Sequence, residues 1–218
     1  MPALKKVLKQ IRKELEEKDK IRESTHNDMR KATSLSKRSI LLMHQKRKKE
    51  AKEVLEEARR IITKLNETST AYPEIIYTGL FSAARQEYAE ANIFLHLTED
   101  ARIATPEEIS VSSVDYVLGL ADVIGEYRRL ALDALRKGNL EKGEECLRIM
   151  DEIYIELMSM DEAYMLVSGL RRKCDVARKI IEITRGDITQ EIRRNALEEH
   201  LRRFEDYAKR SRARRRET

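Results

Sequence analysis

The sequence predicts an all-α protein, a bundle of about six or seven helices that begins with a very long N-terminal helix. Three observations support this fold class. Only three Pro and seven Gly occur among 218 residues, so few positions interrupt a helix. Apolar residues recur at steps of three and four through almost the whole chain, which is the spacing of a helix face. No stretch alternates apolar and polar residues as a half-buried strand does.

The stretch from Ala3 to Tyr72 contains neither Gly nor Pro, so we predict one very long helix or two nearly continuous helices there. Two apolar seams with steps of four and three residues support this prediction, because narrow seams are typical of helices that pack lengthwise. The seams are Leu4, Leu8, Ile11 and Leu15, and Val54, Ala58, Ile61 and Leu65.

Pro73 starts the next helix, which we expect to reach about Leu97. The segment Thr105 to Glu108 combines a capping Thr, a first-turn Pro and a Glu three residues after the cap, and therefore predicts a short helical turn. The remaining expected helices run from Val114 to about Lys137, capped by Ser113 and ended by Gly138; from Leu140 to Met158; from Asp161 to Arg185, ended by Gly186; and from Thr189 to Arg216. We expect a helical domain over residues 1–186 and a basic helical extension over 187–218.

Charge is segregated along the chain. The net formal charge is +9 over residues 1–67, −11 over 68–170 and +7 over 171–218. Basic ends and an acidic middle indicate one surface that attracts polyanions and another that can hold cations. The two cysteines lack metal-ligand spacing and fit buried, reduced thiols. With no long apolar run, these features predict a cytoplasmic protein with no membrane partner.

Two acidic residues interrupt the apolar seam of the helix that follows Pro73. The seam positions are Ile76, Leu80, Ala83, Glu87, Glu90, Phe94 and Leu97. A carboxylate removed from water is costly unless it is paired or bound to a metal, so Glu87 and Glu90 need a reason to be there. They lie about 60° apart on the helix and could serve one ion.

A second acidic pair, Asp122 and Glu126, borders the apolar stripe of the helix that begins at Val114. The two acids are four residues apart and face the same way. If this helix and the preceding one form an antiparallel hairpin joined by residues 98–113, both pairs lie about 15 Å from the connected ends. All four carboxylates would then meet.

Other interpretations of the acids stay open on the pattern alone. They could pair with Arg85, Arg128, Arg129 or a partner chain, as charged residues at helix edges usually do. A di-iron site of the ferritin type would require two Glu-x-x-His motifs, and the sequence has none. An oxygen-only ligand set favours Mg²⁺ or Mn²⁺ over zinc or iron.

A basic segment precedes the acidic one. Residues 22–49 contain nine Lys or Arg and two acids. Arg30, Lys37 and His44 are seven residues apart and share one helix face, which Arg38 adjoins. Such a stripe could follow a phosphate backbone with little sequence preference, although a charge run on a helix is often only a solvated face.

Three segments resemble the translin superfamily, in its Trax-like branch (translin-associated factor X). They are Val114 to Glu126 (VDYVLGLADVIGE), Gln86 to Ala91 (QEYAEA) and Ser36 to His44 (SKRSILLMH). The resemblance covers roughly residues 20–186 and keeps the family's motif order. The loop before the Val114 helix is shorter than in eukaryotic Trax, and the basic tail extends beyond the family core.

The resemblance implies a translin-like fold and a metal-dependent endoribonuclease. It implies that Glu87, Glu90, Asp122 and Glu126 match the catalytic acids of the branch, and their oxygen ligands make Mg²⁺ or Mn²⁺ the expected ion. The likeness of the Ser36 to His44 segment to the family also favours RNA as the ligand of the stripe formed by Arg30, Lys37, Arg38 and His44. Hydrolysis of the phosphodiester with metal-activated water is the expected reaction. Two alternatives are a non-catalytic, translin-like single-stranded nucleic-acid-binding protein and a helical scaffold for acidic proteins.

The family also forms closed shells of about eight subunits around RNA. By resemblance we expect a homo-octamer that encloses single-stranded RNA or a short duplex. The sequence agrees with an assembly, because the seam from Leu4 to Leu15 has no evident cover within a compact bundle.

Overall fold

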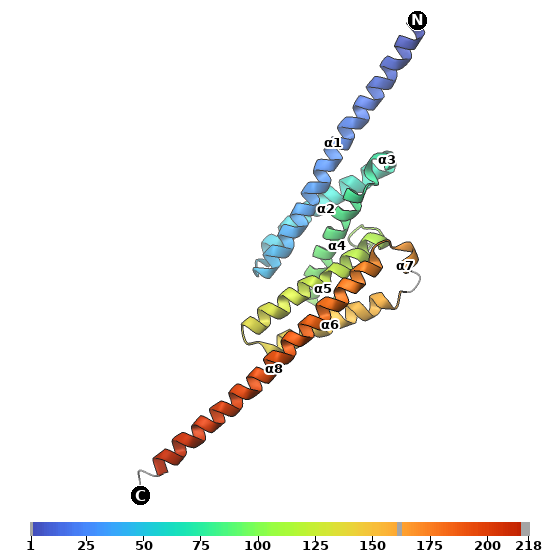
Figure 1. Cartoon of the computed structure of the whole chain (residues 1–218). Coiled ribbons are helices and arrows are strands. Elements are labelled where there is room, and N and C mark those ends of the chain that lie inside the picture. Colours follow the sequence, from blue (N-terminus) through green and yellow to red (C-terminus); the bar gives the residue numbers. More distant parts are fainter. Residues whose placement is uncertain (1, 161–162, 215–218) are drawn as a thin grey trace. The chain divides into compact units, whose positions relative to one another are not determined.

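A computed structural model describes residues 2–160 and 163–214 (Figure 1). Within these residues all regular secondary structure is α-helical, which confirms the predicted fold class. The described chain forms eight helices, slightly more than expected, because two of them are only four residues long. The helices are α1 (Pro2–His44), α2 (Lys48–Ala71), α3 (Pro73–Ile76), α4 (Gly79–Asp100), α5 (Ser113–Arg136), α6 (Leu140–Met158), α7 (Ala163–Leu166) and α8 (Leu170–Arg214).

The chain divides into two compact units and passes between them after Val123, Ser159 and Lys173. One unit contains α1 to α4, the N-terminal half of α5, α7 and the first residues of α8. The other contains the rest of α5, α6 and most of α8.

The long N-terminal helix is confirmed as the 43-residue α1, but the stretch up to Tyr72 is not continuous. It folds into an antiparallel hairpin of α1 and α2. Lys31 Nζ lies 2.6 Å from Glu57 Oε1, and nearer the turn the Ser39 hydroxyl donates to the Ala51 carbonyl at 2.9 Å. The chain reverses at Lys46, which adopts a left-handed φ of 62°.

Small side chains let the two helices of the hairpin approach closely. Ala32, Ser36 and Ser39 are fully buried on the inner face of α1. On α2 the predicted seam is only partly right, because Val54 and Ile61 lie half-buried at its margin. The buried residues of α2 are Ala51, Leu55, Ala58, Ile62, Leu65 and Ser69.

The single helix predicted after Pro73 is two helices. The chain breaks at Tyr77 and Thr78, between the four-residue α3 and the longer α4. All residues from Tyr88 to Leu95 of α4 are buried, so this helix lies at the centre of its unit. Burial raises the pKa of Tyr88 to about 12 and keeps its hydroxyl protonated.

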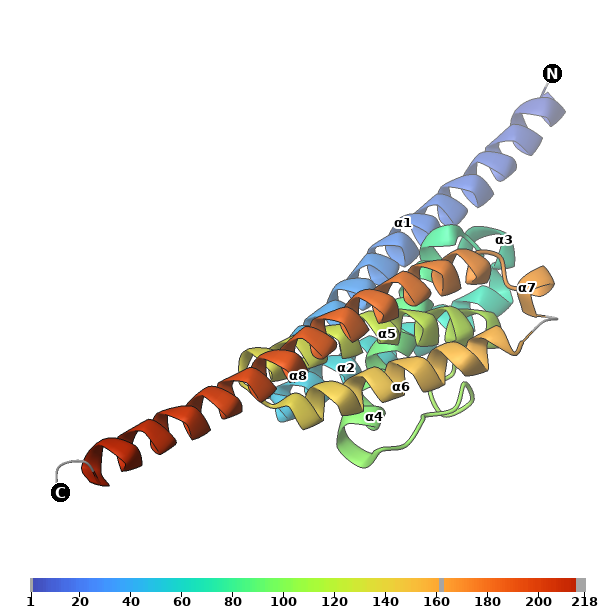
Figure 2. The ribbon, with the colours of Figure 1, turned by 60° about the horizontal axis from the view of Figure 1, so that its bottom comes forward.

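In the second unit, α6 runs antiparallel to α8 (Figure 2). Arg185 Nη2 lies 2.8 Å from Asp151 Oδ1. The predicted bounds of α6 agree with the structure. Gly138 ends α5 with a φ of 71°, as predicted, and the Asn139 side chain accepts a hydrogen bond from the Lys142 amide as the cap of α6.

The predicted helix end at Gly186 is wrong, because α8 runs through it without interruption. The segment predicted as a separate last helix therefore belongs to α8 as far as Arg214, and its predicted end at Arg216 lies outside the described residues. A glycine within a helix costs only about 1 kcal/mol relative to alanine. The neighbouring residues make contacts that hold this part of the helix: Arg185 pairs with Asp151, and Asp187 lies 3.4 Å from Arg128.

Both cysteines, Cys146 and Cys174, are free and buried, as expected. Burial raises the pKa of Cys146 to about 11, which keeps it a thiol at neutral pH. None of the helices in the described residues is both long and apolar enough to cross a membrane.

Candidate acidic site and nucleic-acid interface

The two helices that carry the acids run parallel to each other. Ser82 lies opposite Asp115, with Oγ and Oδ1 2.5 Å apart. One turn further along both helices, Gly119 lies against the Gln86 carbonyl. The predicted antiparallel hairpin is therefore wrong. The loop between α4 and α5 is held against α5 by Tyr116, whose hydroxyl donates a hydrogen bond to the Ala104 carbonyl at 2.8 Å.

The acids of this unit still lie at one level of the two helices. With Gln86 opposite Gly119, the parallel register places Glu90 at the level of Val123, next to Asp122. The register places Glu90 and Asp122 at similar depth, but the predicted meeting of all four carboxylates is not seen, because no three of the described acids are gathered closely enough to hold a metal ion. Glu126 belongs to the second unit, where it is half-buried one turn further along α5.

Close backbone contact brings α4 and α5 together beside the acids. A Cβ atom added at Gly119 would lie 2.7 Å from the Gln86 carbonyl oxygen, 2.8 Å from Ala89 Cβ and 3.0 Å from the Glu90 amide nitrogen. Two of these neighbours are backbone atoms of α4. Any side chain at position 119 would therefore push the helices apart.

We expect Gly119→Ala to lower the free energy of unfolding by about 2 kcal/mol, because overpacking against backbone outweighs the gain in helix propensity. The matched control is Gly186→Ala in α8, where an added Cβ meets nothing within 4 Å. It should instead raise stability by about 1 kcal/mol. Thermal unfolding of both variants measures the two signs, and a stabilised Gly119→Ala protein would disprove the close approach.

Glu87 connects the acidic site with the basic stripe. Its Oε1 lies 3.0 Å from Lys37 Nζ of α1, and the Glu87 side chain is 26% exposed. Helix α1 runs parallel to α4 here, since His44, one stripe step after Lys37, packs its ring 5.2 Å from that of Phe94. The stripe therefore passes directly beside Glu87.

The members of the predicted stripe differ in exposure. Arg30, Lys37 and Arg38 are exposed, whereas His44 is half-buried against Phe94. An exposed guanidinium or ammonium group can reach a phosphate without desolvating the interior. The geometry thus makes the first three residues the accessible part of the stripe.

Asp122 is paired with Lys173, a residue that the sequence interpretation missed. The Lys173 ammonium contacts the Asp122 carboxylate and donates to the Leu118 carbonyl at 3.1 Å and to Gln86 Oε1 at 3.3 Å. It thereby joins α4, α5 and the start of α8. No sequence signal marks Lys173, because it lies 51 positions from Asp122 among several other bases.

Glu90 is the most buried of the acids, with 8% of its surface exposed. It lies within the fully buried part of α4, so its burial follows from the central position of that helix. The predicted apolar seam from Ile76 to Leu97 explains the burial of Glu90 only in part, since Ala83 on the same seam is exposed. Within residues 2–160 and 163–214, no three His, Cys, Asp or Glu side chains are gathered closely enough to hold a metal ion.

Two of the arginines considered as partners of the acids have contacts elsewhere. Arg85 binds Asn66 and Asp115, and Arg128 binds Thr184 and Asp187. The basic groups found at Glu87 and Asp122 are instead two lysines, one from α1 and one from α8.

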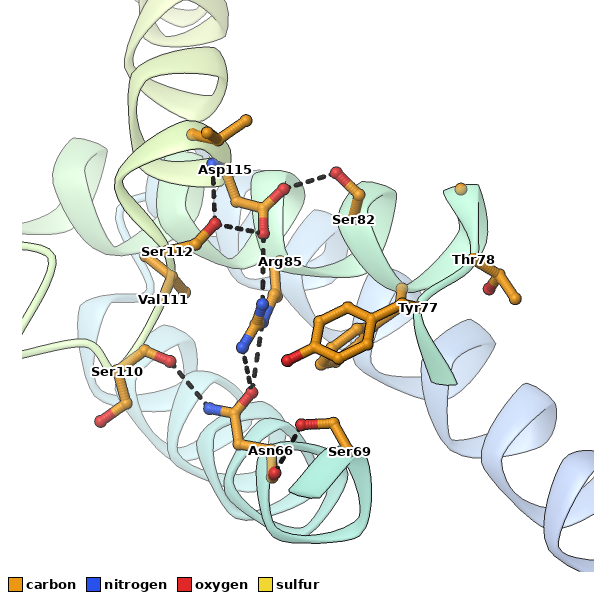
Figure 3. Close-up of a pocket in the computed structure, with 13 residues that line it drawn as sticks. Asn66, Ser69, Tyr77, Thr78, Ser82, Arg85, Ser110, Val111, Ser112 and Asp115 are labelled. Atoms are coloured by element: carbon orange, nitrogen blue, oxygen red, sulfur yellow. Dashed lines mark hydrogen bonds and ion pairs between the residues drawn. The ribbon is translucent and has the colours of Figure 1, made fainter. Parts of the chain in front are cut away.

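A cleft of about 800 Å³ lies at the N-terminal ends of α4 and α5 (Figure 3). Its polar wall centres on Asp115, which accepts hydrogen bonds from Ser82, Ser112 and Arg85. Ser112 caps α5 by accepting the Asp115 amide at 3.1 Å, so the predicted cap at Ser113 was one residue late. The predicted capping turn is present, since Thr105 and Glu108 exchange hydrogen bonds.

The sequence model of the translin family matches residues 3–182. The chain belongs to the translin family. An uncharacterized protein of Methanocaldococcus jannaschii is 37% identical over 193 residues, which are 88% of this chain and 85% of that protein. This family membership confirms the resemblance drawn from the three motifs at the level of the family.

Solved structures similar to this translin-family chain carry the name C3PO. The crystal structure of AfC3PO has a TM-score of 0.74 and 34% identity, over 84% of this chain and 96% of that one. A complex of AfC3PO with duplex RNA has a TM-score of 0.75 at the same identity, over 84% and 95% of the two chains. Apo-NeC3PO has a TM-score of 0.77, over 84% and 96%, and its 24% identity supports the fold alone.

Proposed function

We propose that this translin-family chain binds RNA and cleaves it as a Mg²⁺-dependent endoribonuclease of the Trax-like branch. The observation that carries the proposal is that Glu87, Glu90 and Asp122 lie within about one turn of each other along two parallel helices, and that Glu87 pairs with Lys37 of the basic stripe. RNA held along the stripe would lie next to the acids. The duplex RNA bound by AfC3PO supports the choice of ligand.

The chemistry of the side chains fits a hard divalent cation. Carboxylate oxygens are the ligands that Mg²⁺ prefers, and Mn²⁺ accepts the same set. Glu87, Glu90 and Asp122 of the first unit would hold the ion, and Glu126, further along α5, is the fourth ligand expected from the family resemblance. When bound, Mg²⁺ lowers the pKa of coordinated water and neutralises charge on a scissile phosphate.

The two lysines at the acids have a defined role in this proposal. In the structure the Lys37 and Lys173 ammonium groups supply the positive charge that Glu87 and Asp122 need. A cation at the carboxylates would release both ammonium groups. Lys37, on the exposed stripe, would then be free to bind an RNA phosphate, and Lys173 would remain within reach of the Gln86 side chain.

A second candidate function is supported by the same contacts. Glu87 and Asp122 are already neutralised by lysines, and the described residues contain no three-ligand cluster. A non-catalytic translin-like protein that binds single-stranded nucleic acid would need nothing more. The deciding experiment incubates purified protein with single-stranded RNA and with a short duplex, in Mg²⁺, in Mn²⁺ and in EDTA. Cleavage that requires the metal supports the nuclease, whereas metal-independent binding without cleavage supports the alternative.

We further propose that the protein acts in the cytoplasm as a homo-oligomer, an octamer by analogy with the shells of its family. The exposed seam on α1 supports assembly, with Leu4, Leu8, Ile11 and Leu15 each at least 44% exposed. The two free thiols agree with a reducing compartment. Light scattering measures the mass, and a 25.5 kDa monomer that is fully active on RNA would exclude the shell.

The stripe makes a quantitative prediction. The Arg30→Ala, Lys37→Ala, Arg38→Ala variant should bind unrelated RNA sequences more weakly by similar factors. Its slope of log affinity against log salt should be shallower by about 2, because each lost phosphate contact removes about 0.7 to 0.9. Fluorescence anisotropy at four salt concentrations measures both quantities.

The matched control removes three exposed bases of α8, Arg193, Arg202 and Arg203, and so changes the net charge equally. We expect its salt slope to stay close to that of the wild type. Equal losses in the two triple variants would show that total charge, and not the stripe, determines binding.

A further inference from the structure

The first part of α1 and the last part of α8 lack cover within their own units. None of the residues in the ranges 3–24 and 189–210 is buried. Among the ion pairs of the described residues, the one nearest to the N-terminus that joins α1 to another helix is that of Lys18 with Glu74. Along α8, the start of α6 lies beside Ile188 and Ile192. In Figures 1 and 2 both helices extend past the other helices of their units.

These uncovered segments carry large apolar side chains at coiled-coil spacing. Leu4, Leu8, Ile11 and Leu15 step by four, three and four, with exposures between 44% and 59%. On α8, Leu197, Leu201 and Phe204 repeat these steps, with exposures between 54% and 70%, and Ala208 continues them. Helices of this length are marginal in water without a packed apolar face. We therefore expect each apolar stripe to pack against a partner helix.

We propose that residues 4–15 of one copy of the chain pack antiparallel against residues 197–208 of a second copy. The proposal rests on the homo-oligomer proposed above and names the contact that joins its subunits. Because the two surfaces differ, the contact is head-to-tail and can link successive copies around a closed ring. The family match ends at residue 182, so the α8 surface is a feature of this chain that lies outside the matched region.

Side-chain register supports the antiparallel pairing. With Ile11 opposite Leu201, the heptad spacing also aligns all the remaining apolar positions of the two stripes. The layers are Leu15 with Leu197, Ile11 with Leu201, Leu8 with Phe204 and Leu4 with Ala208. Beyond Leu15 and Leu197 the next layer would bring Lys18 against Arg194, which ends the apolar contact.

The flanking charges favour the same partner. In an antiparallel coiled coil each e position faces the e position of the other helix, and each g position faces g. On one flank Lys5 and Arg12 would face Glu205 and Glu198. On the other flank Glu14 would face His200, and the exposed Val7 would face the exposed Tyr207.

Pairings of two like segments bring like charges together. Two α1 segments packed antiparallel would place Lys5 and Arg12 of both copies on one flank, and two α8 segments would do the same with Glu198 and Glu205. A parallel pair of α8 segments would put Arg194 of both copies in the core. Like charges at these positions destabilise a coiled coil and select its partner.

The test uses the full chain with one cysteine in each stripe, Leu8→Cys together with Phe204→Cys. Native mass is measured first by light scattering, so that a monomeric protein, which overturns the proposed oligomer, is recognised separately. Mild oxidation should then join the chains into products of two or more times 25.5 kDa on denaturing gels. The native thiols are buried and should not interfere.

Three controls make the result specific. Each single-cysteine variant tests for pairing of like segments, and Leu8→Cys with Glu199→Cys places the second thiol on the outer face of α8. We expect at least tenfold less cross-linked product in all three. The proposal is overturned if a single-cysteine variant or the outward pair cross-links as well as the designed pair. It is also overturned if the designed pair forms a disulfide only within one 25.5 kDa chain, even if the protein is oligomeric.

A charge exchange provides an independent readout. Arg12→Glu and Glu198→Arg should each raise the concentration at which the oligomer dissociates by about fivefold, because each places like charges opposite one another. The double variant restores an opposite pair and should return to within about twofold of the wild type. Sedimentation velocity measures the dissociation, and additive losses in the double variant would contradict the contact.

Discussion

Alanine at both Glu87 and Asp122 is expected to abolish Mg²⁺-dependent RNA cleavage while leaving RNA binding intact. A bound metal contributes several kcal/mol to phosphodiester hydrolysis, so losing two of its ligands should reduce the rate by at least about 10³-fold. Binding should be unchanged or tighter, because Lys37 loses its carboxylate partner and becomes free for phosphate. Single-turnover cleavage and anisotropy on one RNA separate the two effects.

The control for this variant is Glu99→Ala. Glu99 lies on the same helix α4 and forms the same kind of contact, with Oε2 2.6 Å from Lys52 Nζ. Its loss removes a Glu–Lys pair of this unit without touching the acidic site, so cleavage should persist. Glu90→Ala and Glu126→Ala extend the test to the other two acids. Undiminished cleavage by the Glu87→Ala, Asp122→Ala protein would exclude this site.

Local signals in the sequence predicted several elements correctly. Gly138 marked the end of α5, because a glycine after the last helical turn acts within one turn of the backbone. The spacing of apolar residues identified the long helices for the same reason. These features depend on neighbours in sequence and not on how helices pack.

Features determined by distant contacts were missed. The turn at Lys46 has no glycine to mark it and is held by the packing of α1 on α2, including the bond from Ser39 to Ala51. Conversely, Gly186 did not end α8, because its cost is small compared with the contacts around it. Either direction of α5 was compatible with a loop of this length, and only contacts such as that between Asn66 and the Ser110 carbonyl decide it.

In the candidate site, too, local features were predicted from the sequence and tertiary contacts were not. The acids were recognisable, because a carboxylate on an apolar seam is anomalous and because their motifs resemble those of the family. Their partners were not recognisable, since Lys37 was marked only as part of the basic stripe and Lys173 not at all. Both meet Glu87 and Asp122 only through the packing of α1 and α8. The pairing state of an acid is a tertiary property, and spacing along one helix cannot reveal it.

Asp115→Ala is expected to be the most destabilising of the single substitutions considered. Asp115 and Arg85 have side chains only 6% and 13% exposed, and the arginine lies 4.2 Å above the Phe81 ring. Removing the carboxylate leaves a buried guanidinium without its counter-ion, which typically costs about 3 to 5 kcal/mol. Ser82 and Ser112 lose their acceptor as well. Thermal unfolding should show a fall of roughly 10 °C for a chain of this size.

A second pair of variants separates the ion pair from simple loss of packing. The Arg85→Met, Asp115→Leu protein removes both charges, so no unpaired ion remains, and it should recover most of the stability lost in Asp115→Ala. Glu152→Ala removes an exposed acid from its pair with Arg148 and should leave the melting temperature nearly unchanged. If Asp115→Ala cost no more than Glu152→Ala, solvent would already be screening the network at the α4 and α5 ends, and the cleft in Figure 3 would not depend on it.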